Sequence, residues 1–421
     1  MWKVSKAYLI AIVVAIIFCT QLRGIFTLMM PLALIFANLF FSYKVSPKTI
    51  FLIILIVFSA FWGLIFNRVD LANTFLFCWL VIPIIILLFC NIIPNKKIFI
   101  PWEYFFKALR NILIVINIIG FISLFIIYKT VDDFGRGYGP HFNGVSGLAV
   151  VNAYVVFYYI SLIYNKKYHR KDIFYCLFFT FSFIFCFSGL TLLTFFATLG
   201  IFLLTKINIK RLIAFCIIII TSYYILKKVS PDILTYNMRN IEIFMSSEQA
   251  KNNARKRVMF ENYIRLVAEN KIISIFTGVG PGGYNSRSCF LINNDSDNFF
   301  TKIMGHHMPY FHEKDIYPLW NSSIVSYERF TDGARNKPFS SIISLSAELG
   351  IIFFTFFLAF WIKQIIQYSH KTKFDKDYFF LFLLNIFMIL LLLSNYWLES
   401  SEFLLFIFIQ NSILQNKKIS Q

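Results

Sequence analysis

The sequence is poor in the residues that build disulfides and metal sites. It has seven cysteines in 421 residues, and six of them lie inside apolar runs, where a thiol behaves as a small hydrophobic side chain. Cys289 is the seventh, and no other cysteine lies in the polar sequence around it. The adjacent His306 and His307 cannot share a helix face, and no His-Glu-x-x-His motif accompanies them. We therefore expect no disulfide framework, no metal and no cofactor.

Acidic residues are few, and the basic residues do not form a cluster. The chain has 40 Lys and Arg against 21 Asp and Glu, a net charge of +19. The basic residues stand at the ends of apolar runs rather than in one patch, which excludes a nucleic-acid footprint. No Gly-Lys-Ser/Thr follows the glycine run 278–283, so it is not a P-loop. This run predicts either a backbone nest for phosphate or, more often, a sharp turn between two helices.

Hydrophobic residues make up most of what remains. They account for 58% of the chain, 53 residues are Phe, and the mean hydropathy is +0.68, values typical of a polytopic membrane protein. Because a span needs about 17–25 mostly apolar residues, we predict an all-α integral membrane protein with about twelve transmembrane helices. The predicted spans are 7–22, 24–42, 50–66, 72–93, 108–128, 145–164, 173–188, 189–205, 212–226, 339–362, 378–396 and 401–415.

Lysine and arginine in the connecting segments predict the orientation. With the N-terminus inside, the inner segments carry 21 of these residues and the short outer segments carry 4. We therefore expect both termini in the cytoplasm and one large extracytoplasmic loop, 227–338, between helices 1–9 (1–226) and helices 10–12 (339–421). The assignment depends on splitting Ile173–Thr205 into two short helices at Ser188-Gly189. One tilted span there would move the large loop into the cytoplasm and break the charge bias of the later loops.

The polar segment contains candidates for anion binding and proton transfer. Arg257, Glu261 and Arg265 fall on one face of a helix predicted over Asn253–Asn270. They form either a solvated ion ladder or an arginine clamp for phosphate oxygens, and the bilayer setting favours the clamp. An imidazole such as His306 or His307 can act as a general base.

Two further groups of polar residues lie near the ends of predicted spans. Arg136, His141 and Asn143 belong to a glycine-rich outer segment that leads into the span at 145. Glu348 stands inside the apolar run that begins at Phe339, where an ionised carboxylate costs at least about 2.5 kcal/mol without a partner. It is either a functional carboxylate or one that pairs with an arginine such as Arg335 near the outer surface.

Taken together, four stretches resemble the bacterial polysaccharide polymerase and O-antigen ligase superfamily, membrane glycosyltransferases that use undecaprenyl-diphosphate-linked sugars. The similar stretches are Arg136–Gly147, with an Arg-x10-Gly spacing; Phe187–Leu193; Arg257–Tyr284, which ends in Gly-Val-Gly-Pro-Gly-Gly-Tyr; and Pro338–Gly350. Two positions depart from the family pattern. Gly189 stands where an arginine is usual, and Phe339-Ser340 stands where ligases have their catalytic histidine. The second departure favours the polymerase.

The resemblance implies a multi-pass protein of the bacterial inner membrane, similar to the GT-C-type enzymes that use lipid-linked sugars. It implies a reaction that moves a growing glycan from undecaprenyl diphosphate onto the next undecaprenyl-diphosphate-linked oligosaccharide, without a metal. Membrane lipid, a flippase and a chain-length regulator are the implied partners, and nucleic acid is not one. The substrate-binding candidates are Arg136, His141, Asn143, Arg257, Arg265, Arg329 and Arg335, and the candidates for the base are Glu348, His306 and His307.

Three other functions compete with the polymerase. A ligase that transfers finished glycan to lipid A core is the nearest, and Phe339 speaks against it. A lipid-linked oligosaccharide flippase or another transporter comes next, although transporters often contain inverted repeats with interrupted helices, which we do not detect in the sequence. A purely structural role is the last.

Overall fold

The computed structural model describes most of the chain. The described residues are 2–20, 25, 28–93, 100–127, 134–135, 138, 144–205, 220–221, 223–224, 227–228, 255–293, 299–321, 323, 338–372 and 375–420. They form helices apart from one antiparallel pair, β1 (Ser42–Lys44) with β2 (Asn91–Ile93). The expectation of an all-α membrane protein is confirmed at this level.

The first part of the chain supplies eight helices in the described ranges. They are α1 (Trp2–Cys19), α3 (Met30–Phe40), α4 (Pro47–Phe66), α5 (Leu71–Phe89), α6 (Trp102–Ile122) with its π-helical extension η1 (Ser123–Ile127), α7 (Gly144–Tyr164), α8 (Arg170–Phe185) and α9 (Gly189–Thr205). Local sequence explains where several begin. Ser46 accepts a hydrogen bond from the Thr49 N–H at 3.2 Å and Pro47 follows it, so α4 starts there.

The polar segment and the last part of the chain supply the rest. Within the polar segment lie α13 (Arg255–Glu269), α14 (Lys271–Phe276), α15 (Arg287–Ile292), α16 (Phe299–Met304), α17 (Tyr310–Asp315) and the short η3 (Tyr317–Leu319). The chain continues with α19 (Ser341–Lys371), α20 (Lys376–Leu391), η4 (Trp397–Glu399) and α21 (Ser401–Ser420). The helix predicted over Asn253–Asn270 is confirmed as α13, and α19 is kinked at Gly350, where φ is 87°.

Five helices of the described chain are long and apolar enough to cross a membrane. These are α4, α5, α6 with η1, α7 and α19, and three shorter apolar helices accompany them at Lys6–Cys19, Met30–Phe40 and Gly189–Leu203. Each of the predicted spans coincides with a helix except 212–226, most of which lies outside the described residues. Length and composition therefore support a multi-pass protein.

The division of Ile173–Thr205 is confirmed as two helices. Helix α8 ends at Phe185 and α9 begins at Gly189. Phe187 between them has a φ of 50°, a left-handed conformation that no helix can continue through. The chain therefore turns sharply at this point.

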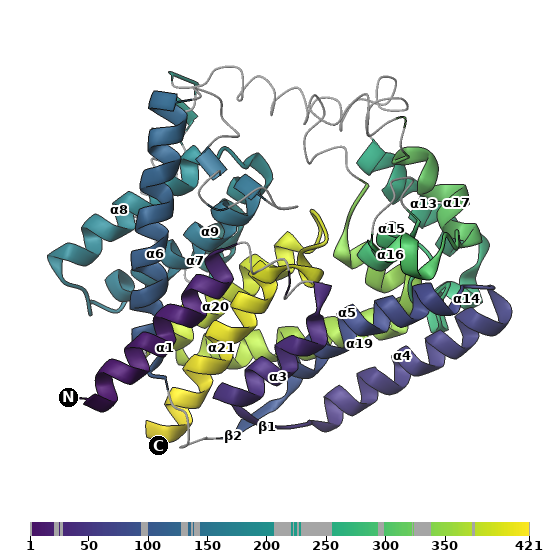
Figure 1. The fold of residues 1–421 in the computed structure, drawn as a ribbon, viewed down its shortest axis with the longest axis horizontal. Coiled ribbons are helices and arrows are strands. Elements are labelled where there is room, and N and C mark those ends of the chain that lie inside the picture. Colours follow the sequence, from purple (N-terminus) through teal and green to yellow (C-terminus); the bar gives the residue numbers. More distant parts are fainter. Residues whose placement is uncertain are drawn as a thin grey trace.

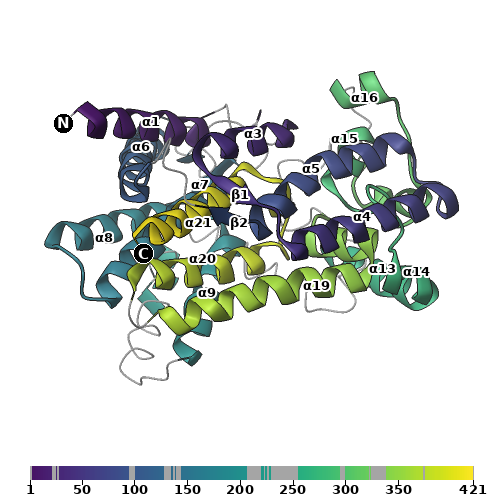
Figure 2. The same ribbon diagram turned by 90° about the horizontal axis from the view of Figure 1, so that it is seen from below.

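The helices place the polar segment at one end of the molecule. Both chain ends and the β1–β2 pair lie together, whereas α13–α17 lie at the opposite end, beside one end of α4, α5 and α19, in both views (Figures 1 and 2). Helix α7 is central, with nearly all of its side chains buried. Inside this core Asn117 and Asn152 exchange hydrogen bonds at 2.9 and 3.0 Å, so neither amide is left unsatisfied.

Candidate functional site

The glycine run 278–283 is a turn inserted between membrane helices. The N–H groups of Val279 and Gly280 donate to the carbonyl oxygens of Ala347 (2.8 Å) and Glu348 (3.1 Å) on α19. On the opposite side, α4 contributes Gly63, whose Cα would lie 2.6 Å from a Cβ placed on Gly280. Gly280 also has a φ of 107°, which only glycine adopts readily. The run therefore holds α4, α19 and the polar segment together.

Glu348 fills the concave side of this turn. Its carboxylate is fully buried and accepts four backbone N–H bonds, from Gly282 (2.6 Å), Tyr284 (3.1 Å), Asn285 (2.8 Å) and Ser286 (2.7 Å). The backbone nest that the glycine run suggested for phosphate thus contains a carboxylate of the protein itself. To act as a general base, Glu348 would first have to give up one of these hydrogen bonds. Its geometry therefore fits a structural role, in which the carboxylate holds the turn in position.

The connection between α20 and α21, residues 392–400, is the place where the other segments meet. The N–H of Ser341, at the start of α19, donates to the carbonyl oxygen of Asn395 at 3.1 Å. The Tyr396 hydroxyl donates to Asn285 Oδ1 at 3.0 Å, directly beyond the glycine turn. Phe339 stacks on Tyr396 with ring centroids 4.4 Å apart. This α20–α21 connection therefore touches the resembling stretch Pro338–Gly350 and also Asn285, the residue that follows the stretch Arg257–Tyr284.

Two buried glutamates flank the end of the α20–α21 connection. Glu399 is 3% exposed, and its Oε2 atom has no hydrogen-bond partner. Burial raises the pKa of the Glu399 carboxyl to about 8. The nearby Arg287 guanidinium lowers this pKa, and repulsion from Glu348 raises it further. Glu402, at the start of α21, accepts from the Tyr138 hydroxyl at 3.3 Å. A Cβ on Gly147 would lie 2.3 Å from Glu402 Oε1, so a larger residue there would displace this carboxylate.

Three cationic side chains reach the same region. Arg287, the first residue of α15, donates from Nη1 to the Glu399 carbonyl oxygen at 2.7 Å and interacts electrostatically with the Glu399 and Glu402 carboxylates. Lys256, on α13, donates to the Ser394 carbonyl oxygen. Arg255 lies over the Trp320 ring, 5.8 Å from its centroid. Arg255 and Lys256 are both nearly buried, so each of these two charges lies in low-dielectric surroundings.

The predicted arginine face of α13 points elsewhere. Arg257 pairs with Glu261 at 2.9 Å, as an i,i+4 ion ladder would, and Glu261 is half exposed. Arg265 instead pairs with the buried Asp315 of α17 at 2.7 Å. The two arginines therefore both contact carboxylates of the polar segment, while Lys256 contacts the α20–α21 connection and Arg255 contacts Trp320.

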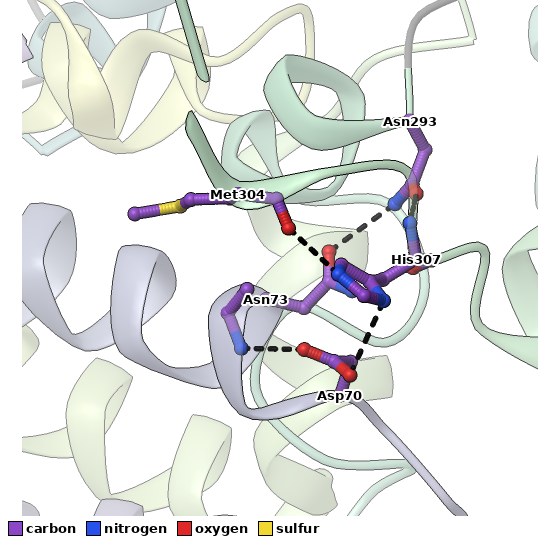
Figure 3. A network of polar contacts seen from close by, with 6 residues as sticks. Asp70, Asn73, Asn293, Met304 and His307 are labelled. Carbon is purple, nitrogen blue, oxygen red and sulfur yellow. Dashed lines mark hydrogen bonds and ion pairs between the residues drawn. The ribbon is translucent and has the colours of Figure 1, made fainter. Parts of the chain in front are cut away.

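His307 joins the polar segment to the start of α5. Its Nδ1 lies 3.3 Å from Asp70 Oδ2, and its Nε2 donates to the Met304 carbonyl oxygen at 2.7 Å (Figure 3). Because both partners are acceptors, the two contacts are made together only when both ring nitrogens carry hydrogen. Asn73 and Asn293 complete the network around the His307 backbone. In this arrangement His307 has no lone pair open to a substrate hydroxyl.

The remaining histidines of the segment differ in exposure. His306 is exposed and stands beside the network. His312 is buried, donates from Nδ1 to the Tyr284 carbonyl oxygen at 2.5 Å, and packs edge-on against Phe290. Burial lowers the pKa of His312 to about 4. His312 is therefore a neutral residue of the packed segment.

Five of the predicted substrate-binding residues lie outside the described part of the chain. They are Arg136, His141, Asn143, Arg329 and Arg335. Two neighbours of the first three are described, Tyr138 and Gly147, and both contact Glu402.

Sequence reasoning missed the residues that the structure gathers at the α20–α21 connection: Arg255, Lys256, Arg287, Glu399 and Glu402. The available signal was the Glu-Ser-Ser-Glu run 399–402, which places two acidic residues directly before the last apolar run. Among the described residues, no group of three or more His, Cys, Asp and Glu side chains is placed to hold a metal ion.

An apolar cavity among the described residues lies away from this site. Its volume is about 490 Å³, and it is lined by α9, α19 and α20 through residues such as Phe202, Ile366 and Ile389. Ile366 stands 18 residues beyond Glu348 along α19, which corresponds to about 27 Å of helix. The cavity therefore takes no part in the charged site.

Comparisons with known proteins assign no family to this chain. No protein-family model matches the sequence, and a search of curated proteins finds no significant match.

Proposed function

We propose that this chain is a polymerase of lipid-linked oligosaccharide repeat units in a bacterial inner membrane. The reaction transfers a growing glycan from undecaprenyl diphosphate to a sugar hydroxyl of the next undecaprenyl-diphosphate-linked unit. Twelve spans in a GT-C-type arrangement, cytoplasmic termini and a periplasmic polar segment belong to the same proposal. A flippase would supply the outward-facing units, and a chain-length regulator would act beside the polymerase.

The observation that carries the proposal is the convergence of the four stretches that resemble the superfamily. The first contributes Tyr138 and Gly147, which contact Glu402. The second meets the first through Ser188, whose hydroxyl donates to Ser146 at 3.3 Å. The third and fourth meet where the Gly282 and Tyr284 N–H groups donate to Glu348. Stretches up to about 200 residues apart in sequence thus surround one charged centre.

The chemistry of that centre fits a diphosphate leaving group. Negative charge develops on the diphosphate as its bond to the sugar breaks, and fixed cations in a water-poor site stabilise that charge strongly. Arg255, Lys256 and Arg287 are nearly or partly buried and fixed by backbone or aromatic contacts. Buried carboxylates beside them can accept a proton from a sugar hydroxyl.

The aromatic surroundings of Phe339 favour the polymerase over the ligase. Phe339 packs between Phe290, Trp320 and Tyr396, with ring centroids 4.8, 5.8 and 4.4 Å away. A phenyl ring in this cluster offers no proton acceptor, so a ligase mechanism that needs histidine at this position has no counterpart in this chain.

A gel of surface polysaccharide tests the proposal. Cells of the native host that lack the gene should keep lipid A core bearing a single repeat unit and lose the ladder of longer chains. Complementation with the wild-type gene should restore the ladder. Bare core with polymer accumulating on the lipid carrier would identify a ligase, and bare core without outward-facing lipid-linked units would identify a flippase.

A further inference from the structure

Resting on the proposed function, we propose that Glu399 takes the proton from the acceptor sugar hydroxyl while Arg287 binds the donor diphosphate beside it. The ligand of this pair is a prenyl diphosphate that carries a sugar. Sequence reasoning assigned the base to Glu348, His306 or His307, so the inference replaces that assignment with a residue of the α20–α21 connection.

The three buried carboxylates differ in what already occupies them. Glu348 accepts four backbone N–H groups. Glu402 accepts from the hydroxyls of Tyr138 (3.3 Å) and Ser401 (3.2 Å). Glu399 keeps a buried Oε2 atom without a hydrogen-bond partner. A buried polar atom without a partner is costly, and a bound group that approaches the Glu399 Oε2 atom would remove that cost.

Arg287 is the cation in direct contact with Glu399. The Arg287 side chain is partly exposed, yet its Nε is buried and its Nη1 donates to the Glu399 backbone carbonyl at 2.7 Å. The guanidinium therefore lies against the glutamate main chain. Guanidinium groups bind phosphate oxygens through paired N–H donors. A diphosphate that engages Arg287 draws the reacting sugar to the place where the Glu399 side chain lies.

The backbone around Glu399 is held in place, as a reacting group requires. The Leu398 N–H donates to Ser341 Oγ at 3.2 Å, which ties η4 to the start of α19. The Trp397 indole donates to Ser394 Oγ at 2.8 Å, which closes the turn before η4. Positioning of this kind lowers the entropic part of the barrier for group transfer.

The titratable groups around Glu399 come from several elements. Arg287 of α15, Glu348 of α19, Tyr396 of the α20–α21 connection and Glu402 of α21 all belong to the same cluster. Helix α5 also packs against η4 but has no acidic or basic residue in Leu71–Phe89. Burial raises the pKa of Glu399 to about 8. A base of this strength titrates close to physiological pH, where general-base catalysis is efficient.

The step is balanced without a further reactant. The acceptor hydroxyl oxygen forms a bond to the anomeric carbon of the donor, and the bond from that carbon to the diphosphate oxygen breaks. The hydroxyl proton moves to the Glu399 carboxylate, and undecaprenyl diphosphate leaves with the electron pair. Glu399 then returns the proton to solvent as the product moves on.

The experiment uses full-length protein in lipid vesicles with lipid-linked repeat units and follows elongation between roughly pH 6 and 9, where the pKa of a perturbed carboxyl can be observed. For the wild type we expect a rate that rises with pH, reaches half of its maximum near pH 8 and levels off towards pH 9, because the base must lose its proton first. Glu399→Gln should lower the rate by about 10²–10⁴-fold and abolish this rise. Glu399→Asp should be faster than Glu399→Gln, and its rate should still rise with pH. Glu313→Gln, a change at an exposed glutamate, is the matched control.

Binding of farnesyl diphosphate separates the two roles. Above pH 8, where the wild-type Glu399 is mostly ionised, Glu399→Gln should bind this probe as well as the wild type or more tightly, because that neighbouring negative charge is gone. Arg287→Ala should weaken binding by at least about tenfold, whereas Arg287→Lys should retain part of it. Normal elongation by Glu399→Gln, or wild-type binding by Arg287→Ala, would overturn the inference and leave the proposed function standing. A wild-type protein that elongates nothing would overturn both.

Discussion

At the scale of single residues, the buried Glu348 carboxylate organises the turn that faces it. Four backbone N–H groups converge on it, and no water-facing oxygen remains on the side chain, which is 0% exposed. Hydrogen bonds to an ionised acceptor are about twice as strong as neutral ones. These bonds therefore compensate part of the desolvation cost of the carboxylate, and the carboxylate satisfies donors that the glycine turn would otherwise bury unpaired.

Replacing Glu348 should show this structural role directly. Glu348→Gln puts an NH₂ group where an oxygen accepts N–H bonds, so at least one backbone donor is left unsatisfied. We expect a loss of roughly 2–4 kcal/mol in the free energy of unfolding, measured as a lower thermal unfolding midpoint in detergent. The exposed Glu313→Gln serves as control. An unchanged midpoint for Glu348→Gln would contradict the account of the turn.

His312 gives the polar segment a defined acid sensitivity. Burial lowers the pKa of His312 to about 4 from the ordinary value of 6.5. The unfolded chain binds this proton at higher pH than the folded chain does, so stability is present above about pH 6.5 and falls as the pH drops towards 4. The shift corresponds to about 3 kcal/mol.

Thermal unfolding of His312→Asn over the same pH range tests this statement. The variant should lose stability at neutral pH but show a flatter decline on acidification than the wild type, because no buried imidazole remains to be charged. His306→Asn, at an exposed position, should follow the wild-type curve. Equal slopes for wild type and His312→Asn would assign the acid sensitivity to other groups.

At the scale of elements, the α20–α21 connection and the glycine turn are the two segments that bring distant parts of the chain together. The connection receives bonds from the start of α19 through Ser341, from α15 through Arg287 and from α13 through Lys256. The turn is held between α4 and α19. Both are short, so a small change in either should disturb several helices at once.

A pair of glycine substitutions tests the turn. Gly280→Ala introduces a methyl group 2.6 Å from Gly63 Cα at a backbone φ of 107°, which must push α4 and the polar segment apart. We expect a clearly lower unfolding midpoint and a smaller fraction of monodisperse protein. Gly200→Ala in α9 meets no atom within 4 Å and should be neutral or slightly stabilising. Similar behaviour of the two variants would argue against the close contact.

Helix positions could be predicted from the sequence because each long apolar run directly indicates a membrane helix. The start of α7 was expected at 145 and lies at Gly144, and α13 lies inside its expected range. Contacts between elements leave no such local mark. Periodicity places Arg257 and Arg265 on one face of α13, but whether that face or the one with Lys256 turns inwards depends on the α20–α21 connection, about 140 residues later.

The partners of polar residues were unpredictable for the same reason. Glu348 was recognised as unusual from its apolar surroundings, whereas the four amides that surround it come from a turn that could not be docked from sequence. Asn73, which donates to the His307 carbonyl oxygen, precedes it by 234 residues. The sequence therefore identifies unusual single residues such as Glu348, whereas the hydrogen-bond partners that determine their chemistry are known only from the fold.

At the scale of the whole molecule, the two ends have different polar chemistry. The end with both termini contains Lys417 bridged to Asp375 (2.5 Å) and Asp377 (2.7 Å), and Lys418 donating to the Ile92 carbonyl oxygen. The other end holds helices α13–α17 of the polar segment (Figure 1). We propose that the first end faces the cytoplasm and the second the periplasm.

Labelling with a membrane-impermeant maleimide tests that orientation. A cysteine introduced at His306, which is exposed in the polar segment, should react in intact spheroplasts. A cysteine at Lys167, exposed between α7 and α8, should react only after permeabilisation. The parent protein without an added cysteine gives the background. The reverse pattern would place the charged site in the cytoplasm, away from the proposed substrates.

Reconstitution tests the central claim most directly. Purified full-length protein in lipid vesicles would be supplied with a radiolabelled undecaprenyl-diphosphate-linked repeat unit and no other enzyme, and the glycan length and the released undecaprenyl diphosphate would be measured. The account predicts a ladder of lipid-linked oligomers, with one undecaprenyl diphosphate released for each unit added. Repeat units that stay single in the presence of folded protein, or that are transferred only when lipid A core is supplied, would contradict it.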